Sequence, residues 1–243
     1  MAEARKKLGL ILPSSNTTVE PDFHRVLPAH VSLHASRIWV VDVTHDDLEA
    51  MNSDAATAAR YVGTAEVDAI AYACTSGSFI GGPRYDQGLL ARIKAESGGA
   101  PSVGTSPAMV AALRAVGIQR VSVVTPYTDE INEGLTTFLT AHGFDVLSMA
   151  GQQIVPNVEI GAQTPETIVA FAKANLHPEA DGLFLSCTNW RAMEVAERLE
   201  RETGKPVVTS NQATLWAALG ALGVVKPLDG YGRLLRQHAD AGG

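Results

Sequence analysis

The stretches VDAIAYACTS (67–76) and ADGLFLSCTN (180–189) place the only two cysteines of the chain, Cys74 and Cys187, in the same local setting. In each stretch an aspartate stands six residues before the cysteine, an apolar run follows the aspartate, and a threonine follows the cysteine. Short apolar runs that are closed by small or turn-forming residues are typical of buried parallel strands. Each stretch therefore predicts a buried strand with a cysteine just beyond its carboxyl end.

Six further runs of the chain have strand character. LGLILPSSN (8–16) and RVSVVTPYT (120–128) are the stronger ones, and weaker ones occupy 31–40, 101–107, 144–151 and 206–211. Segments of helical composition separate them, at 46–63, 84–97, 106–116, 129–142, 164–176, 190–203 and 211–222. Such alternation of strand and helix predicts an α/β protein with parallel sheets flanked by helices.

The order of these pieces repeats along the chain. After each cysteine come a helix, a proline-led strand that ends GTSP (104–107) or VTSN (208–211), and an Ala- and Leu-rich helix. We therefore predict a duplicated four-stranded unit. One domain is expected to comprise 1–105 and 212–243, and the other 106–211. The chain would cross between them near 105–108 and 209–213, and GYGRLLRQHAD (230–240) would pack back on the first domain.

Composition excludes several classes of function. The net charge is −7 and aromatic residues make up 6% of the 243 residues, so no basic nucleic-acid surface is expected. No apolar run approaches the roughly 20 residues that span a bilayer, and the amino-terminal run is too short for a signal peptide. We expect a cytoplasmic protein with no nucleic-acid or membrane partner. A reducing compartment disfavours a disulfide, and the cysteines lack the spacing of metal ligands.

The residues beyond the predicted strand ends are candidates for a site. Ligands of open parallel sheets bind beyond the carboxyl ends of the strands, where Asn16, Cys74, Tyr127 and Cys187 stand. We expect both cysteines to open helices, whose N–H groups favour anions and lower a thiol pKa. The alternatives are inert burial of the thiols, helix capping by Asn16, and a space-filling role for Tyr127.

Several motifs resemble the aspartate/glutamate racemase superfamily, and within it the maleate cis–trans isomerases and arylmalonate decarboxylases. They are PSSNTTVEPDF (13–23), ACTSGSFIGG (73–82), VVTPYTDEINE (123–133), VPNVEIG (155–161), LSCTNW (185–190) and GYGRL (230–234). The resemblance implies two pseudo-symmetric Rossmann-like domains with the active site in the cleft between them. It also implies no metal or organic cofactor and a homodimer or higher homo-oligomer. Decarboxylases of the family carry a glycine where this chain has Cys74.

The resemblance assigns roles to individual residues. Cys74 corresponds to a nucleophile that adds to maleate, and Cys187 to the group that gives and removes a proton. One substrate carboxylate is assigned to Asn16, Thr75 and Ser76. The other is assigned to Tyr127, Asn157, Thr188 and Asn189. Thr75 and Thr188 are also possible helix caps, and Asn157 a turn residue.

Four functions stay open at this point. The leading one is cis–trans isomerisation of maleate, or of a close cis-unsaturated dicarboxylate, to fumarate. A racemase would use the two thiols to exchange a proton at one carbon, and a non-catalytic protein would only bind a small acid. A decarboxylase of malonate-type acids is disfavoured by the presence of Cys74.

Overall fold

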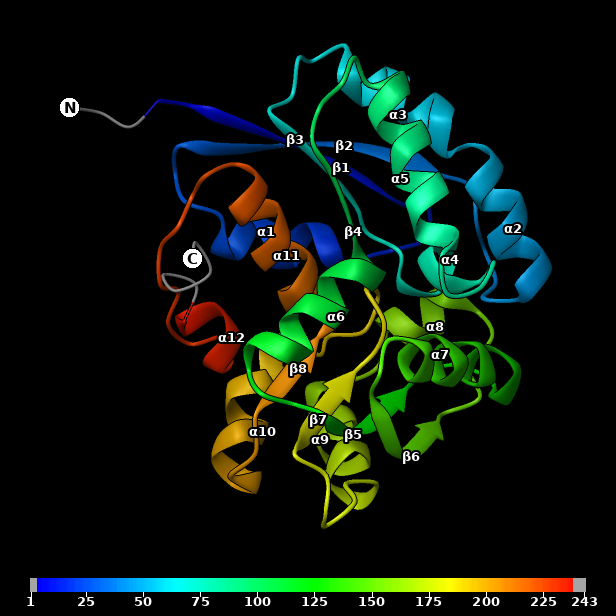
Figure 1. Ribbon diagram of the computed structural model, residues 1–243, viewed down its shortest axis with the longest axis vertical. Coiled ribbons are helices and arrows are strands. Elements are labelled where there is room, and N and C mark those ends of the chain that lie inside the picture. The colour runs from blue at the N-terminus through cyan, green and yellow to red at the C-terminus, as the bar shows by residue number, and fades with distance from the viewer. Residues whose placement is uncertain (1–3, 238–243) are drawn as a thin grey trace.

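The computed structural model describes residues 4–237 of the chain. Eight strands form two four-stranded parallel sheets, as the alternation of strand and helix predicts (Figure 1). The first sheet has the order β2-β1-β3-β4 and the second the order β6-β5-β7-β8. When the strands of each sheet are numbered from one, both orders become 2-1-3-4, so the predicted duplication is a duplication of topology.

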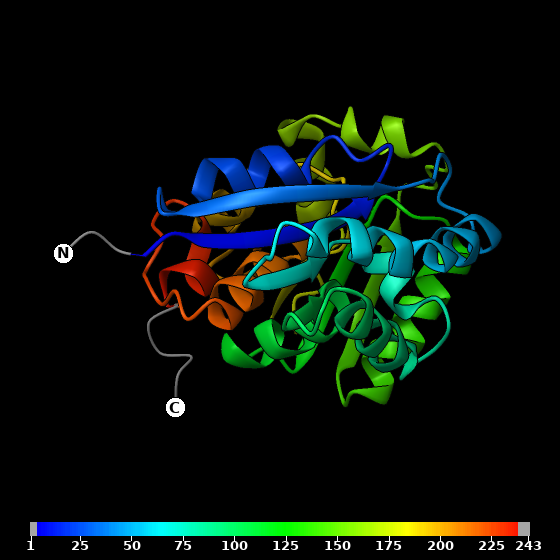
Figure 2. The same ribbon diagram turned by 90° about the horizontal axis from the view of Figure 1, so that it is seen from above.

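The first sheet consists of β1 (Lys6–Pro13), β2 (Val31–Ile38), β3 (Ala69–Tyr72) and β4 (Ser102–Gly104). The second consists of β5 (Arg120–Thr125), β6 (Asp145–Gly151), β7 (Gly182–Leu185) and β8 (Val207–Thr209). All eight runs with strand character therefore contain a strand. In Figure 2 the neighbouring strands β1 and β2 run side by side along the first sheet.

The aspartates that precede the cysteines have the same structural role in both halves. A carboxylate oxygen of Asp68 accepts a hydrogen bond from the Lys7 N–H at 2.7 Å, and one of Asp181 accepts from the Arg120 N–H at 2.7 Å. Each carboxylate thus fixes the start of the neighbouring central strand. The spacing of aspartate and cysteine is therefore the spacing between the two ends of one strand.

The helices that flank the first sheet are α1 (Val19–Val26), α2 (His45–Ser53), α3 (Ala55–Gly63), α4 (Thr75–Phe79), α5 (Tyr85–Glu96) and α11 (Ser210–Ala221). The sheet is apolar on both faces. Leu8, Leu10 and Leu12 pack with α1 and α11, whereas Ile11 joins the core beneath α2 and α3. This alternation follows from the two-residue period of a strand. The predicted helix over 46–63 is interrupted at Asp54.

The remaining helices are α6 (Thr105–Ala115), α7 (Asp129–Ala141), α8 (Asn157–Gly161), α9 (Pro165–Ala174), α10 (Ala196–Thr203) and α12 (Gly232–Arg236). The helices α6 and α11 pack against each other between the two sheets (Figure 1). They begin at Thr105 and Ser210, where the chain was expected to cross. The helix α12 contacts α10 and β8 as well as α11, so it touches both halves.

Three sequence-based expectations go beyond these observations. The domain boundaries stay a prediction, and the end of the segment 230–240 lies outside the described residues. No helix of residues 4–237 is long and apolar enough to cross a membrane. The cytoplasmic location also stays a prediction.

Candidate active site

The residues that follow β1, β3, β5 and β7 meet at one buried pocket. The residues lining it are Pro13, Asn16, Val40, Val43, Leu48, Cys74, Thr75, Ser76, Tyr127, Asn157, Cys187, Thr188 and Asn189. All nine site residues expected from the sequence are in this set. Both halves of the chain contribute, so the structure brings the two cysteine motifs to one small volume.

Cys74 is the N-cap residue of the one-turn helix α4. Its sulfur accepts a hydrogen bond from the Gly77 N–H at 3.3 Å and lies 3.8 Å from the Ser76 hydroxyl. Burial nevertheless raises the pKa of the Cys74 thiol to about 11, and these two hydrogen bonds only reduce the shift. The expected lowering of the thiol pKa is therefore wrong for this closed pocket, because loss of water outweighs two donors.

Cys187 has a different local structure. Residues 188–192 form turns, a 3₁₀ helix occupies Met193–Val195, and α10 begins only at Ala196. The expectation that Cys187 opens a helix is thus wrong. Its sulfur accepts a hydrogen bond from the Asn189 N–H at 3.3 Å. Burial raises the pKa of this thiol to about 12, although the Tyr127 hydroxyl and the Asn189 N–H oppose the rise.

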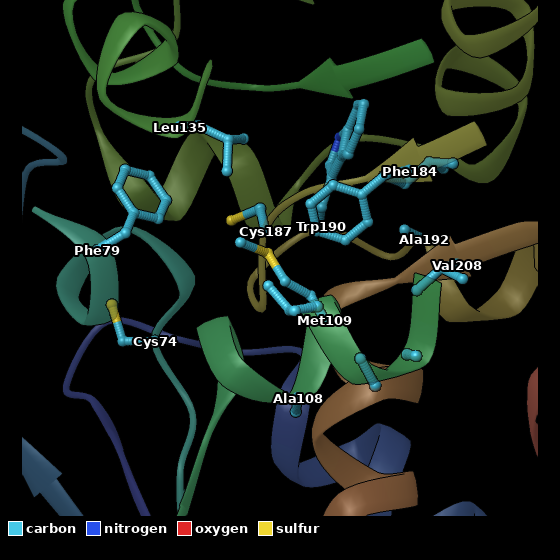
Figure 3. Close-up of a cluster of buried hydrophobic side chains, with 14 of the residues drawn as sticks. Cys74, Phe79, Ala108, Met109, Leu135, Phe184, Cys187, Trp190, Ala192 and Val208 are labelled. Carbon is cyan, nitrogen blue, oxygen red and sulfur yellow. The ribbon is translucent and has the colours of Figure 1, made fainter. Parts of the chain in front are cut away.

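The two thiols lie on facing segments of the two halves. Figure 3 shows Cys74 close to Phe79, and Cys187 across from it, beside Leu135 and Trp190. Each thiol is at most 5% exposed, and the charge of a Cys74 thiolate contributes to the raised pKa of Cys187. One molecule held in the pocket can therefore touch both sulfur atoms.

Asn16 caps a helix and also faces the other half. Its Oδ1 accepts hydrogen bonds from the Thr18 and Val19 N–H groups at 2.9 and 3.0 Å, which satisfies the start of α1. Its Nδ2 donates to the Thr188 hydroxyl at 3.1 Å. That hydroxyl in turn donates to the Ala73 carbonyl at 3.1 Å. The capping interpretation and the pocket location both hold for Asn16.

The side chains of Asn157 and Asn189 join the two halves. Asn157 Nδ2 donates to the Ser15 hydroxyl at 2.8 Å, and Asn189 Nδ2 donates to the Asn157 carbonyl at 2.6 Å. Asn189 Oδ1 accepts from the Thr17 N–H at 2.8 Å. The Asn189 amide is thus occupied by protein partners on both sides. The group of Asn189 that can take part in the reaction is its backbone N–H, which donates a hydrogen bond to the Cys187 sulfur.

An apolar wall of the pocket was not found by the sequence analysis. Val40, Val43 and Leu48 follow β2 at the same sheet edge as the other site residues. Their segment is bound to the second half, because Asn157 N–H donates to Val41 O at 3.0 Å and Val43 N–H donates to Val155 O at 2.9 Å. Their place beyond the carboxyl end of a parallel strand could have identified them as pocket residues. In the sequence, however, apolar residues at this place look the same as residues of the hydrophobic core.

The closed pocket is smaller than a dicarboxylic acid. Its volume is about 20 Å³, which is close to the space that one water molecule needs. No Lys, Arg or His is among the lining residues, and Arg191 pairs instead with Glu194 at 2.8 Å. Across residues 4–237, no group of three or more His, Cys, Asp or Glu could hold a metal ion. Hydroxyl, amide and N–H groups are the polar groups that face a ligand.

A buried carboxyl group lies behind the Cys187 turn. Asp22 on α1 is 1% exposed, and its carboxylate accepts a hydrogen bond from Asn211 Nδ2 at 2.7 Å. The same Nδ2 donates to the Thr188 carbonyl at 3.1 Å. Burial raises the pKa of Asp22 to about 6. The folded protein therefore favours the protonated form, and ionisation of Asp22 destabilises it.

This raised pKa predicts how stability depends on pH. A carboxyl group whose pKa is raised in the folded protein binds its proton more tightly there than in the unfolded chain. Its contribution to the free energy of unfolding is therefore lost as the pH rises from about 4 to about 6. Asp22→Asn removes this loss and keeps an acceptor for Asn211. We expect the variant to gain up to about 3 kcal/mol of unfolding free energy at pH 8 relative to pH 4.

Urea unfolding at both pH values measures this difference. Glu49→Gln on the exposed surface of α2 is the matched control for the loss of a carboxylate. An Asp22→Asn variant that is destabilised equally at both pH values would contradict the assignment.

The comparison with known sequences decides the family. The sequence profile of the arylmalonate decarboxylase family matches residues 8–235. A maleate isomerase from Nocardia farcinica is 31% identical, over 96% of this chain and 97% of its own. The chain belongs to the maleate isomerase and arylmalonate decarboxylase family.

Two further members of this family are informative. The arylmalonate decarboxylase of Bordetella bronchiseptica is 30% identical, over 93% of this chain and 95% of its own. A cysteine-to-serine variant of the Nocardia farcinica maleate cis–trans isomerase has been solved with a covalently bound succinylcysteine intermediate. Its TM-score is 0.91 at 30% identity, with 96% of this chain and 99% of that chain covered. Family members thus include both isomerases and decarboxylases.

Proposed function

We propose that this protein catalyses cofactor-independent cis–trans isomerisation of maleate, or of a close cis-unsaturated dicarboxylate, to fumarate. The observation that carries the proposal is the pair of buried thiols on opposite sides of one pocket lined by neutral hydrogen-bond donors. The bound succinylcysteine intermediate of the Nocardia farcinica relative supports a covalent route.

The reaction proceeds through a thioether. The Cys74 thiolate adds to one vinylic carbon, so that a C–S bond forms and the π electron pair moves to the neighbouring carbon. That carbon takes a proton from the Cys187 thiol. Rotation about the resulting C–C single bond brings the carboxylates to opposite sides. The Cys187 thiolate then removes the proton, the double bond re-forms, and the C–S bond breaks.

The environments of the two thiols favour this division of roles. Burial raises the pKa of both thiols, so the groups beside each sulfur decide which role it takes. The Gly77 N–H stabilises a thiolate on Cys74. The Tyr127 hydroxyl and the Asn189 N–H lie beside Cys187 and stabilise the thiolate left after proton donation.

Neutral donors suit a substrate that must rotate. Ser76 and the first N–H groups of α4, which lack intrahelical acceptors, can bind one carboxylate. Tyr127 and Asn157 can bind the other. Val40, Val43 and Leu48 offer no hydrogen bonds to hold a moving carboxylate. The substrate enters when the segment 40–43 separates from 155–157, because the closed volume is too small.

The raised thiol pKa predicts the pH dependence of turnover. With a pKa of about 11, only about one Cys74 in ten thousand is a thiolate at pH 7. The thiolate fraction grows tenfold per pH unit below the pKa, so kcat/KM for maleate should rise about tenfold per unit from about pH 7 to pH 9. Initial rates in buffers of constant ionic strength measure this. A flat profile over this range would show that Cys74 is already ionised.

A decarboxylase is the second candidate, because the family includes such enzymes and one is 30% identical to this chain. Proton NMR separates the two functions. In a tube with maleate, an isomerase replaces the vinylic singlet of maleate with that of fumarate. In a tube with an arylmalonate, a decarboxylase produces the arylacetate. Conversion of maleate alone supports the proposal, and conversion of the malonate alone would replace it.

A further inference from the structure

The helix α4, which carries the N–H donor for Cys74, is a single turn of five residues. So short a helix leaves most of its carbonyl groups without intrahelical partners, and its packing fixes its position more than its own hydrogen bonds do. The Gly77 carbonyl is one of these groups. It accepts a hydrogen bond from Asn52 Nδ2 of α2 at 2.7 Å.

Asn52 is held in turn by two tyrosines. Its Oδ1 accepts a hydrogen bond from the Tyr72 hydroxyl, and its Nδ2 lies 3.1 Å from the Tyr85 hydroxyl. Asn52 is 1% exposed and Tyr72 is fully buried. The amide therefore uses both of its N–H donors and its acceptor within the protein, which fixes its orientation.

Residue 77 is confined between this network and the nucleophile. A Cβ built on Gly77 would lie 2.7 Å from Met51 Cε, 2.8 Å from the Tyr72 hydroxyl and 3.0 Å from the Cys74 sulfur. Gly77 thus faces the Tyr72–Asn52 pair on one side and Cys74 on the other. Its carbonyl is bound by Asn52, and its N–H donates to the sulfur at 3.3 Å.

The helix that holds α4 also lines the pocket. Leu48 and Asn52 are one turn apart on α2 and therefore share a face of that helix. Leu48 contributes to the apolar wall, while Asn52 binds α4. One rigid element thus connects the wall of the pocket with the donor for the nucleophile.

We propose that Asn52, oriented by Tyr72, is a positioning residue that holds the Gly77 N–H on the sulfur of Cys74 and thereby stabilises the thiolate. The proposal rests on the proposed function only in naming Cys74 as the nucleophile. A hydrogen bond to an ionised group is stronger than one to a neutral group, so the Gly77 N–H favours the thiolate over the thiol. Loss of the Asn52 support lets α4 shift and weakens this bond.

The test measures the thiol directly. In a Cys187→Ser background, the pH dependence of Cys74 alkylation by iodoacetamide, read by peptide mass spectrometry, gives its pKa. Asn52→Ala and Tyr72→Phe are compared with Asn175→Ala, which loses a similar side-chain bond to the Phe171 carbonyl, and neither of these two residues lines the pocket. We expect the pKa of Cys74 to rise by about one unit or more in the first two variants and to stay unchanged in the third.

Turnover provides the second readout. With Cys187 restored, Asn52→Ala and Tyr72→Phe should lower kcat for maleate about tenfold to a hundredfold and leave KM nearly unchanged. An unchanged Cys74 pKa would overturn the proposal, whatever happens to kcat, since it would leave Asn52 a purely structural residue. Tyr72→Phe preserves the ring and decides the question if Asn52→Ala does not fold. If wild-type protein leaves maleate unchanged, the proposed function is wrong. The pKa of Cys74 measured by alkylation still shows in that case whether Asn52 positions the Gly77 N–H.

Discussion

Replacement of Cys74 by serine should reduce turnover of maleate about ten-thousand-fold or more while the protein stays folded. The serine hydroxyl occupies nearly the same space and can still accept the Gly77 N–H. It is a far weaker acid than a thiol, however, and this buried site raises the pKa even of the thiol to about 11. Almost no alkoxide would form, so the addition step that begins the reaction is lost.

The initial rate of fumarate formation measures this loss, and circular dichroism with a thermal melt tests the fold. Ser186→Ala is the matched control, because Ser186 is a fully buried neighbour of Cys187 whose hydroxyl has no hydrogen-bond partner. It changes one buried atom without touching either thiol and should retain wild-type turnover. A Cys74→Ser variant that keeps a tenth of the wild-type rate would remove Cys74 from the nucleophilic role.

Replacement of Cys187 by serine should have a different signature. The Cys74 thiolate can still add to maleate, with the proton supplied slowly by water. Elimination needs a base beside the carbon that was protonated, and a serine hydroxyl is too weak a base for this. We therefore expect kcat to fall about a thousandfold or more and the thioether to accumulate.

Mass spectrometry of the acid-quenched variant detects the adduct. The intact mass should increase by the mass of one maleic acid, and peptide analysis should locate the increase on Cys74. The double variant Cys74→Ser/Cys187→Ser is the control and should carry no adduct. An adduct on another residue, or an unmodified variant that turns over normally, would contradict the assigned roles.

The sequence predicted the duplicated sheets and four of the candidate site residues, Asn16, Cys74, Tyr127 and Cys187, for one physical reason. Apolar runs ending in polar residues mark the carboxyl ends of parallel strands, and these ends lie at the same edge of a sheet. The repeat of aspartate, strand and cysteine placed Cys74 and Cys187 at equivalent strand ends. The family motifs added Thr75, Ser76, Asn157, Thr188 and Asn189, and all nine expected residues line the pocket.

The acidity of the thiols was predicted wrongly because it depends on solvent exclusion. A sequence indicates that Cys74 opens a helix, but it does not show that Val40, Val43 and Leu48 close the pocket. The local structure after Cys187 was also missed. The Asn189 amide bonds with Thr17 and Asn157 instead of continuing a helix, and asparagine side chains commonly compete with helix formation in this way.

The support of α4 by Asn52 was also not predictable from local pattern. Asn52 and Gly77 are separated by 25 residues, and a buried asparagine within a helical segment gives no sign of its partner. Only the packing of α2 against α4 brings the amide to the Gly77 carbonyl.

The crystal structure of Cys187→Ser protein soaked with maleate would show directly whether the Cys74 sulfur adds to the substrate. We expect continuous electron density between the Cys74 sulfur and a substrate carbon. One carboxylate should lie at Asn16, Thr75 and Ser76, and the other at Tyr127 and Asn157. An unmodified Cys74 beside intact maleate, or an adduct whose carboxylates bind elsewhere, would contradict the proposed mechanism.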